Sequence, residues 1–166
     1  MEEIKTNKVT VRKGTEKDLP KVLELICELA THVNHLDQVE VTVEDMAKDG
    51  FGPNPVFGFF IAENQNGIIG LALYYYRYST WKGKVVYLED LVVKEAYRAQ
   101  GIGTKLLKSV INLAKEQGLR HVSWQVIDTN VSAIGYYREK FGAQLHNNWI
   151  NCLLPAGDFE RVLSEK

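Results

Sequence analysis

The amino-acid sequence predicts a fold of the α/β class (α+β mixed sheet), with a central, mostly antiparallel sheet flanked by helices. Three observations carry this prediction. Helical patterns and β-rich runs alternate, three of the β runs follow one another across tight turns, and a glycine-rich loop joins a β run to a helix. The expected order is strand, two helices, three strands, helix, strand, helix, strand, with a β-α-β unit at its centre.

The first half of the chain contains the antiparallel part of the sheet. Asp18 can cap the first helix, and Thr42 begins a capping-box pattern at the second. Asn66-Gly67 and the turn at 81–83 separate the three consecutive strands, which therefore form a meander. The expected elements are a strand at 9–12, a helix at 19–30, a helix from 43 to near 50, and strands at 56–63, 68–78 and 84–93.

The second half of the chain contains the β-α-β unit and a further helix. Apolar residues on one side of the helix after the loop at 98–104 indicate that it packs on the sheet, and Gly118 ends it. The segment 128–130 caps a later helix. The expected elements are this helix up to Gly118, a strand at 122–126, a helix at 131–140 and a last strand within 149–154.

Composition narrows the class of protein. The 166 residues suit one domain over 1–166, and 45% hydrophobic with 25% charged residues is typical of a soluble globular protein. Twenty basic and twenty-one acidic residues give a net charge of -1, so no nucleic-acid partner is expected. The two cysteines and four histidines share no metal-ligand spacing, so no metal is expected. No targeting segment and no apolar run near 18 residues is found, so we expect a cytoplasmic protein without a membrane partner.

The loop Arg98-Ala99-Gln100-Gly101-Ile102-Gly103-Thr104 is the most informative segment. Its glycines allow a close approach of backbone to ligand, its amides continue into the first turn of a helix, and Arg98 adds a permanent cation. Such a loop suits phosphates. The spacing fits neither a Walker A loop nor a dinucleotide fingerprint, because Lys105 follows Thr104 and Leu106 stands where a third small residue belongs. A plain turn between strand and helix is the alternative.

This element order, with Arg-x-x-Gly-x-Gly after the fourth strand and Asn130 followed by Tyr137 after the fifth, resembles the GCN5-related N-acetyltransferase (GNAT) family over nearly the whole chain. Three segments are similar to its spermidine/spermine (diamine) branch and the thialysine-acetylating relatives. These segments are 87–93 (Tyr-Leu-Glu-Asp-Leu-Val-Val), the tyrosines 74–76 with Trp81, and 49–52 (Asp-Gly-Phe-Gly).

The resemblance implies that acetyl-CoA (coenzyme A) is the cofactor. Its pyrophosphate is expected at the amides of 99–104 and at the helix start, with Arg98 either beside it or facing solvent. Its pantetheine arm is expected between splayed fourth and fifth strands. The residues expected to bind the coenzyme are Leu91, Val92, Val93, Arg98, Ala99, Gln100, Gly101, Ile102, Gly103, Thr104, Asn130, Ser132 and Tyr137.

Acetyl transfer to an amine requires a group that removes a proton from the ammonium. Glu89 is the candidate. In a regular strand it shares one face with Tyr87, Leu91 and Val93, whereas Asp90 points to the other face. A carboxylate paired for structural reasons is the alternative interpretation of Glu89, and Asp90 is expected as a strand residue or a contact to the substrate cation.

Tyr137 is the candidate general acid, because a phenol can protonate a departing thiolate. It lies seven residues after Asn130 and on the inward face of its helix, whereas Tyr136 lies toward the edge. An ordinary core tyrosine is the alternative. The family usually places a glycine four residues after this tyrosine, but Gly142 comes five residues after it, and a register based on Gly142 would put Arg138 in this position.

The resemblance also implies the substrate class. Its acceptor contacts map to Glu89, Asp90, His32 and Trp81. The polyamine enzymes are more acidic at 31–35, where this chain has Thr-His-Val-Asn-His, so a diamine, a polyamine and a lysine-like amino acid all stay open as acceptors. We therefore expect an enzyme, an acetyl-CoA-dependent N-acetyltransferase for the primary amine of a small cationic acceptor, and a homodimer. The alternatives are a non-catalytic acyl-CoA-binding module and an acetyltransferase acting on protein amines.

Overall fold

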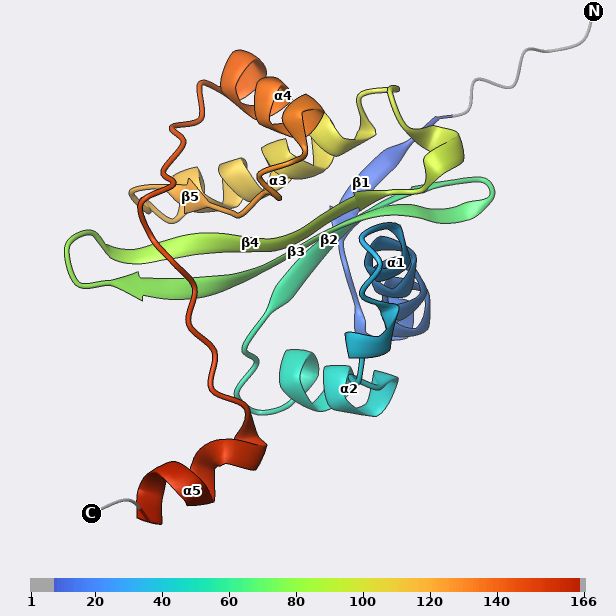
Figure 1. The fold of residues 1–166 in the computed structure, drawn as a ribbon. Helices are drawn as coiled ribbons and strands as arrows, with labels where there is room; N and C mark the ends of the chain where they lie inside the picture. Colours follow the sequence, from blue (N-terminus) through green and yellow to red (C-terminus); the bar gives the residue numbers. More distant parts are fainter. Residues whose placement is uncertain (1–7, 165–166) are drawn as a thin grey trace, which may run out of the picture. The chain divides into compact units, whose positions relative to one another are not determined.

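The structure is a computed structural model that describes residues 8–164 (Figure 1). The chain divides into two compact units, Met1–Gln125 and Val126–Lys166, which are described in turn. A single domain over 1–166 stays a prediction. The strands and α-helices of the first unit are β1 (Thr10–Lys13), α1 (Leu19–His32), α2 (Val43–Phe51), β2 (Gly58–Asn64), β3 (Gly67–Ser79), β4 (Gly83–Val93), α3 (Ile102–Glu116) and β5 (Val122–Ser123). Its 3₁₀ helices are Glu16–Asp18, Leu36–Gln38 and Glu95–Tyr97.

The sheet has the order β1-β2-β3-β4-β5, and the expected mixed α/β class is confirmed. The first four strands are antiparallel, and β5 runs parallel to β4 after the crossover through α3. The β-α-β unit therefore lies at one edge of the sheet rather than at its centre. β5 pairs only with Val86 and Tyr87, so within the described residues the edge of β4 beyond Tyr87 carries no strand.

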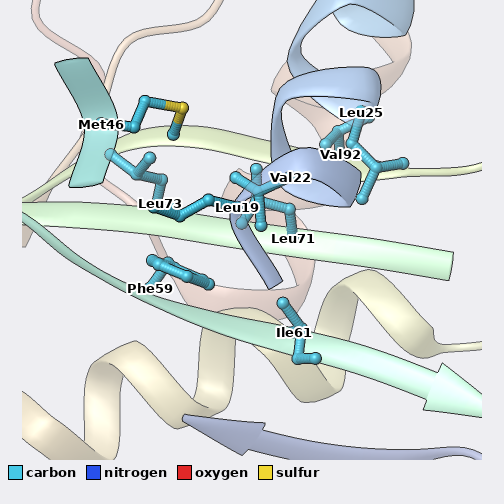
Figure 2. Close-up of a cluster of buried hydrophobic side chains, with 9 residues drawn as sticks. All are labelled: Leu19, Val22, Leu25, Met46, Phe59, Ile61, Leu71, Leu73 and Val92. Atoms are coloured by element: carbon cyan, nitrogen blue, oxygen red, sulfur yellow. The ribbon is translucent and has the colours of Figure 1, made fainter. Parts of the chain in front are cut away.

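The two faces of the sheet are covered by different helices (Figure 1). On one face α1 and α2 pack over a buried apolar cluster, which Figure 2 shows as Leu19, Val22, Leu25, Met46, Phe59, Ile61, Leu71, Leu73 and Val92. On the other face α3 packs so closely that a Cβ on Gly70 would lie 3.0 Å from a methyl group of Leu106. Each fully buried leucine contributes about 1.5–3 kcal/mol, so this core holds the sheet between its helices.

Of the two helix caps expected in this unit, one is confirmed and the other is not. Thr42 caps α2 as expected, since its hydroxyl accepts a hydrogen bond from the Asp45 amide at 3.1 Å. The expected cap at Asp18 is wrong. The Asp18 carboxylate turns to Arg12 at 2.8 Å and to the Thr15 amide at 2.8 Å. The hydrogen bonds from Arg12 hold the pKa of Asp18 well below its usual range, because an adjacent guanidinium stabilises the charged carboxylate.

The C-terminal unit contains α4 (Val131–Phe141), a 3₁₀ helix (Ala156–Asp158) and α5 (Phe159–Ser164). The expected strand within 149–154 is wrong, since this segment has no regular structure, and the strand expected at 122–126 is only Val122–Ser123. Apolar, β-prone residues make a strand only where a neighbouring strand accepts their backbone hydrogen bonds. The sequence pattern of a segment does not show whether such a neighbouring strand is present.

Candidate active site

A β-bulge interrupts β4 at the two acidic residues. Leu88 lies opposite Tyr74 and Asp90 lies opposite Leu73, so Glu89 is an extra residue without a partner in β3. The expected division of faces is therefore wrong in part, because Asp90 faces away from Leu91 and Val93 as expected but shares its face with Tyr87. The bulge shifts the alternation by one residue, which puts Asp90 on the face of Leu73, under α1 and α2, and Leu91 on the opposite face with its partner Ala72.

Asp90 is the more buried carboxyl group of the pair. Its burial, followed by the nearby charge of Glu89, raises the pKa of Asp90 to about 6. A carboxyl group with this pKa gains and loses its proton close to neutral pH, as an acid or a base at work in a catalytic site must. Glu89 is exposed at the bulge. The pair thus presents one solvated carboxylate beside one that titrates near neutrality.

Two tyrosines adjoin this acidic pair. Tyr75 and Tyr87 are cross-strand partners, and their ring centroids lie 5.1 Å apart. Burial raises the pKa of both phenols, and the charge of Glu89 raises each of them further. The charge of Glu89 therefore reaches both rings. Because Tyr75 alternates with Leu73 along β3, Tyr75, Tyr87 and Asp90 share one face of the sheet.

The glycine-rich loop forms the N-terminal end of α3. Gly101 is left-handed at φ 76°, and so is Ala99 at φ 59°, a conformation that a residue with a side chain rarely adopts. Successive residues of this kind turn their amides toward one concave side, where an anion can bind. The first hydrogen bond inside α3 joins the Lys105 amide to the Gly101 carbonyl. The amides of Ile102 and Gly103 thus precede the helical ladder and face the end of the helix.

Two details connect this loop to the end of β4. The Nε of Arg98 donates a hydrogen bond to the Val93 carbonyl at 3.0 Å, which holds the guanidinium beside the strand end. A Cβ added to Gly103 would meet only a methyl group of Val93, at 3.8 Å, an ordinary contact. The protein therefore has room for a side chain at Gly103, and the absence of one leaves the backbone open to a ligand.

The expected coenzyme-binding stretch Leu91–Val93 lies on the part of β4 that pairs with β3 on one side and, in the described part of the chain, with no strand on the other. β5 has already ended its pairing at Tyr87, whereas β3 pairs with β4 on the other side along its whole length. Extended ligands can bind such an edge by backbone hydrogen bonds, as an added strand would. The acidic bulge, the free edge and the glycine-rich loop follow one another along 89–104.

The candidate site residues that follow β5 belong to the C-terminal unit. Asn130 caps α4, since its Oδ1 accepts a hydrogen bond from the Ala133 amide at 3.1 Å. Ser132 is exposed on the first turn. The helix runs without interruption from the cap to Gly142, which is left-handed at φ 64°. The extra residue before Gly142 therefore lengthens α4 at its C-terminal end.

Tyr137 is half-buried, whereas Arg138 is exposed. Burial, followed by the adjacent Tyr136, raises the pKa of Tyr137, so its phenol is protonated at neutral pH. Tyr136 packs within the helix, with its ring 5.4 Å from that of Tyr137 and 5.5 Å from that of Phe141. These observations favour the register based on Asn130.

The two remaining candidates are exposed. His32 is the last residue of α1, one turn beyond Glu28, which pairs with Lys94 at 3.7 Å. Trp81 is 83% exposed in the turn between β3 and β4. Six residues of extended strand, about 20 Å, separate Gly83 from Glu89. Within one chain the structure therefore does not bring Trp81 to the acidic pair.

From the sequence, Asp90 was expected to have a smaller role than its burial and raised pKa indicate. The pattern held a signal, because two adjacent charged residues interrupt an apolar strand in which regular alternation would bury one of them.

Among the described residues no group of three His, Cys, Asp or Glu side chains is arranged to hold a metal ion, and no helix is both long and apolar enough to cross a membrane.

The class of protein follows from the match of the sequence to a known protein family. The model of the acetyltransferase (GNAT) family matches residues 20–143, and the chain belongs to this family. It is an acetyl-CoA-dependent N-acetyltransferase.

Individual relatives and solved structures agree with this class. The chain is 39% identical over 144 residues to a thialysine N-epsilon-acetyltransferase of Bos taurus, covering 82% of this chain and 84% of the relative. It is 38% identical to a spermidine/spermine N(1)-acetyltransferase-like protein 1 of Homo sapiens, over 78% of this chain and 20% of that protein. An aminoglycoside acetyltransferase from a soil metagenome, solved with sisomicin, shares the fold at a TM-score of 0.74 and 23% identity, covering 89% of this chain and 97% of its own.

Proposed function

We propose that this acetyltransferase acts on the primary amine of a small cationic acceptor, and that acetyl-CoA binds along the free edge of β4 and at the glycine-rich loop. The observation that carries the proposal is the acidic bulge at Glu89 and Asp90, which lies immediately before that edge. A cationic amine is drawn to such a pair of carboxylates. Acetyl-CoA supplies a thioester whose acetyl carbon forms the new C–N bond while its C–S bond breaks.

The residues fit this donor. The left-handed Ala99 and Gly101, the first amides of α3 and the open space at Gly103 favour a phosphate group at 99–104. Arg98, held by Val93, adds a positive charge. The backbone of Leu91–Val93 would hold the extended arm, and Asn130 and Ser132 are the further coenzyme contacts that we propose.

The chemical work of the chain is to move protons. An alkylamine has a pKa of about 10, so the acceptor arrives as an ammonium ion and must lose a proton before its nitrogen can attack. Glu89 takes this proton directly or through water, and Asp90, with its pKa near neutrality, holds the cation and serves as a second acceptor. Tyr137, whose pKa is raised, donates the proton that the leaving sulfur requires.

An acetyl-CoA consumption screen with purified protein tests this function. Diamines, polyamines, lysine-like amino acids and lysine-containing peptides serve as acceptors, and release of the free thiol is measured. Turnover of at least one small amine is expected. Acetylation of peptides alone would support an enzyme for protein amines. Coenzyme binding without turnover of any amine would contradict the proposal and leave a non-catalytic acyl-CoA-binding module.

A homodimer is the second part of the proposal. The C-terminal unit leaves apolar side chains uncovered, among them Trp149, Ile150 and Leu153, which are 75%, 90% and 86% exposed. Several large apolar side chains exposed within one short segment favour an interface. Trp81, distant from the acidic pair of its own chain, would be available to the site of the partner. Light scattering at high micromolar concentration should give twice the monomer mass, and a monomer mass would contradict the dimer.

A further inference from the structure

A cavity of about 310 Å³ lies in the first unit, where β2 begins. β2 starts at Gly58 opposite Tyr74, so β3 continues past it with no strand on that side among residues 8–164. Gly58 lets the Tyr74 side chain lie against the backbone at this point, because a Cβ there would lie 2.7 Å from the Tyr74 hydroxyl. The aromatic residues that line the cavity are Phe51, Phe57, Phe59, Tyr74, Tyr75 and Tyr76.

The cavity adjoins the acidic pair through β3. Its wall residue Tyr75 pairs with Tyr87 on β4, and Leu73, two residues before Tyr75, pairs with Asp90. The pKa of the Tyr75 phenol, raised by burial, is raised further by the charge of Glu89, which places the cavity wall within electrostatic reach of the bulge. An acceptor whose amine binds at the bulge can therefore extend its other end toward the cavity.

The charges around the cavity are positive. Among the residues that line it, Lys13 is charged and none is acidic. In the described part of the chain no salt bridge joins Lys13 to an acid, whereas its neighbour Arg12 is paired with Asp18 and Glu63.

Aromatic rings ordinarily attract cations, but two rings in this region already face cations of the protein. The Nζ of Lys84 lies 3.7 Å from the centroid of the Tyr76 ring, and the guanidinium of Arg77 lies 6.0 Å from that of Tyr87. A second ammonium group of an acceptor would compete with these cations and meet the charge of Lys13. The cavity suits an apolar or carboxylate-bearing group.

We propose that this cavity binds the far end of the acceptor and selects acceptors whose far end carries no net positive charge, such as an amino acid with a side-chain amine, over diamines and polyamines. This inference rests on the proposed function, because the near end of the acceptor is the amine at Glu89 and Asp90. It makes Lys13 a residue that determines specificity rather than one that takes part in catalysis.

A matched series of acceptors tests the inference. Lysine, n-pentylamine and 1,5-diaminopentane present the same primary amine on a five-carbon chain, and they differ in the charge at the far end. We expect kcat/KM for lysine and for n-pentylamine to exceed that for 1,5-diaminopentane at least tenfold. A preference for 1,5-diaminopentane would overturn the inference while leaving the proposed function intact. No turnover of any amine would overturn both.

Variants assign the preference to the cavity. Lys13→Gln should raise kcat/KM for 1,5-diaminopentane several-fold relative to lysine, whereas Lys17→Gln, which removes the same charge outside the cavity, should leave the ratio unchanged. Val56 lines the mouth and is 64% exposed, so Val56→Trp should fold normally and narrow the cavity.

With Val56→Trp the KM for lysine should rise about tenfold, while the KM for the short acceptor ethylamine and for acetyl-CoA should stay the same. Val41→Trp, at a 40% exposed valine outside the cavity, is its control. Unchanged ratios with Lys13→Gln, or an unchanged KM for lysine with Val56→Trp, would overturn the inference.

Discussion

Asp90 lies opposite Leu73 on the α1–α2 face of the sheet, although regular alternation from Tyr87 would have turned it to the other face. The extra residue Glu89 causes this shift and places two carboxylates side by side on β4. Most of the chemistry expected of this chain depends on that relationship.

Replacement of Asp90 by asparagine should stabilise the protein at neutral pH and lower its activity. Folding raises the pKa of this carboxyl group from its ordinary value of about 4 to about 6. The native state thus binds more protons than the unfolded state between these values, so stability falls as pH rises from about 4 to 6 and stays lower above it. An amide avoids this cost, which is about 3 kcal/mol for a shift of about two pKa units.

Urea unfolding at pH 4 and pH 7.5 checks this prediction. The wild-type protein should lose stability relative to Asp90→Asn between the two pH values, and the exposed Glu89→Gln variant should stay within about 0.5 kcal/mol of the wild type. An Asp90→Asn protein that is equally stable relative to wild type at both pH values would show that the carboxyl group titrates normally.

Replacement of Glu89 by glutamine should lower kcat and shift the pH profile of amine acetylation, with acetyl-CoA affinity nearly unchanged. The amide keeps the shape of the side chain but cannot take a proton from the ammonium, and it removes a negative charge that attracts the cationic acceptor. Steady-state kinetics between pH 6 and 10 measure this. Wild-type rates at every pH would remove Glu89 from the mechanism.

Replacement of Gly103 by valine should weaken acetyl-CoA binding while the fold persists. The nearest atom to a new Cβ is 3.8 Å away, so the protein itself tolerates a side chain, and the loss reflects obstruction of the phosphate. Calorimetry should show weaker binding in the order glycine, alanine, valine, with melting temperatures that change little. Equal affinity for all three would show that the loop does not hold the pyrophosphate.

Replacement of Tyr137 by phenylalanine should cut kcat by about tenfold to a hundredfold, with the melting temperature and acetyl-CoA binding preserved. General acid catalysis contributes about 10²–10⁴-fold, and a thiolate is already a fair leaving group, so the lower end applies. The adjacent Tyr136→Phe is the matched control and should keep kcat nearly intact, because Tyr136 packs on Phe141. A reversed pattern would contradict the register based on Asn130.

The parts of the fold that depend on neighbouring residues were predictable. Thr42 and Asn130 each cap a helix by accepting a hydrogen bond from an amide three residues later, and the expected hairpin turn lies just before Gly67. The glycine-rich loop was predictable for the same reason, because its positive φ values and the start of α3 depend on residues that are close together in the sequence. For this reason the family and the position of the candidate coenzyme site could be inferred before the structure.

What the sequence by itself determined is the set and order of the strands and α-helices from β1 to α4, and the types of side chain at residues 89–104. The tertiary structure alone decided the bulge at Glu89, the pairing of Asp18 with Arg12 instead of the amides of α1, and the absence of a strand at 149–154. Each of these depends on how separate elements come together, although Arg12 in β1 is only six residues from Asp18. A bulge forms only against a partner strand, a carboxylate pairs with whichever cation the fold brings near, and a strand needs a neighbour to accept its hydrogen bonds.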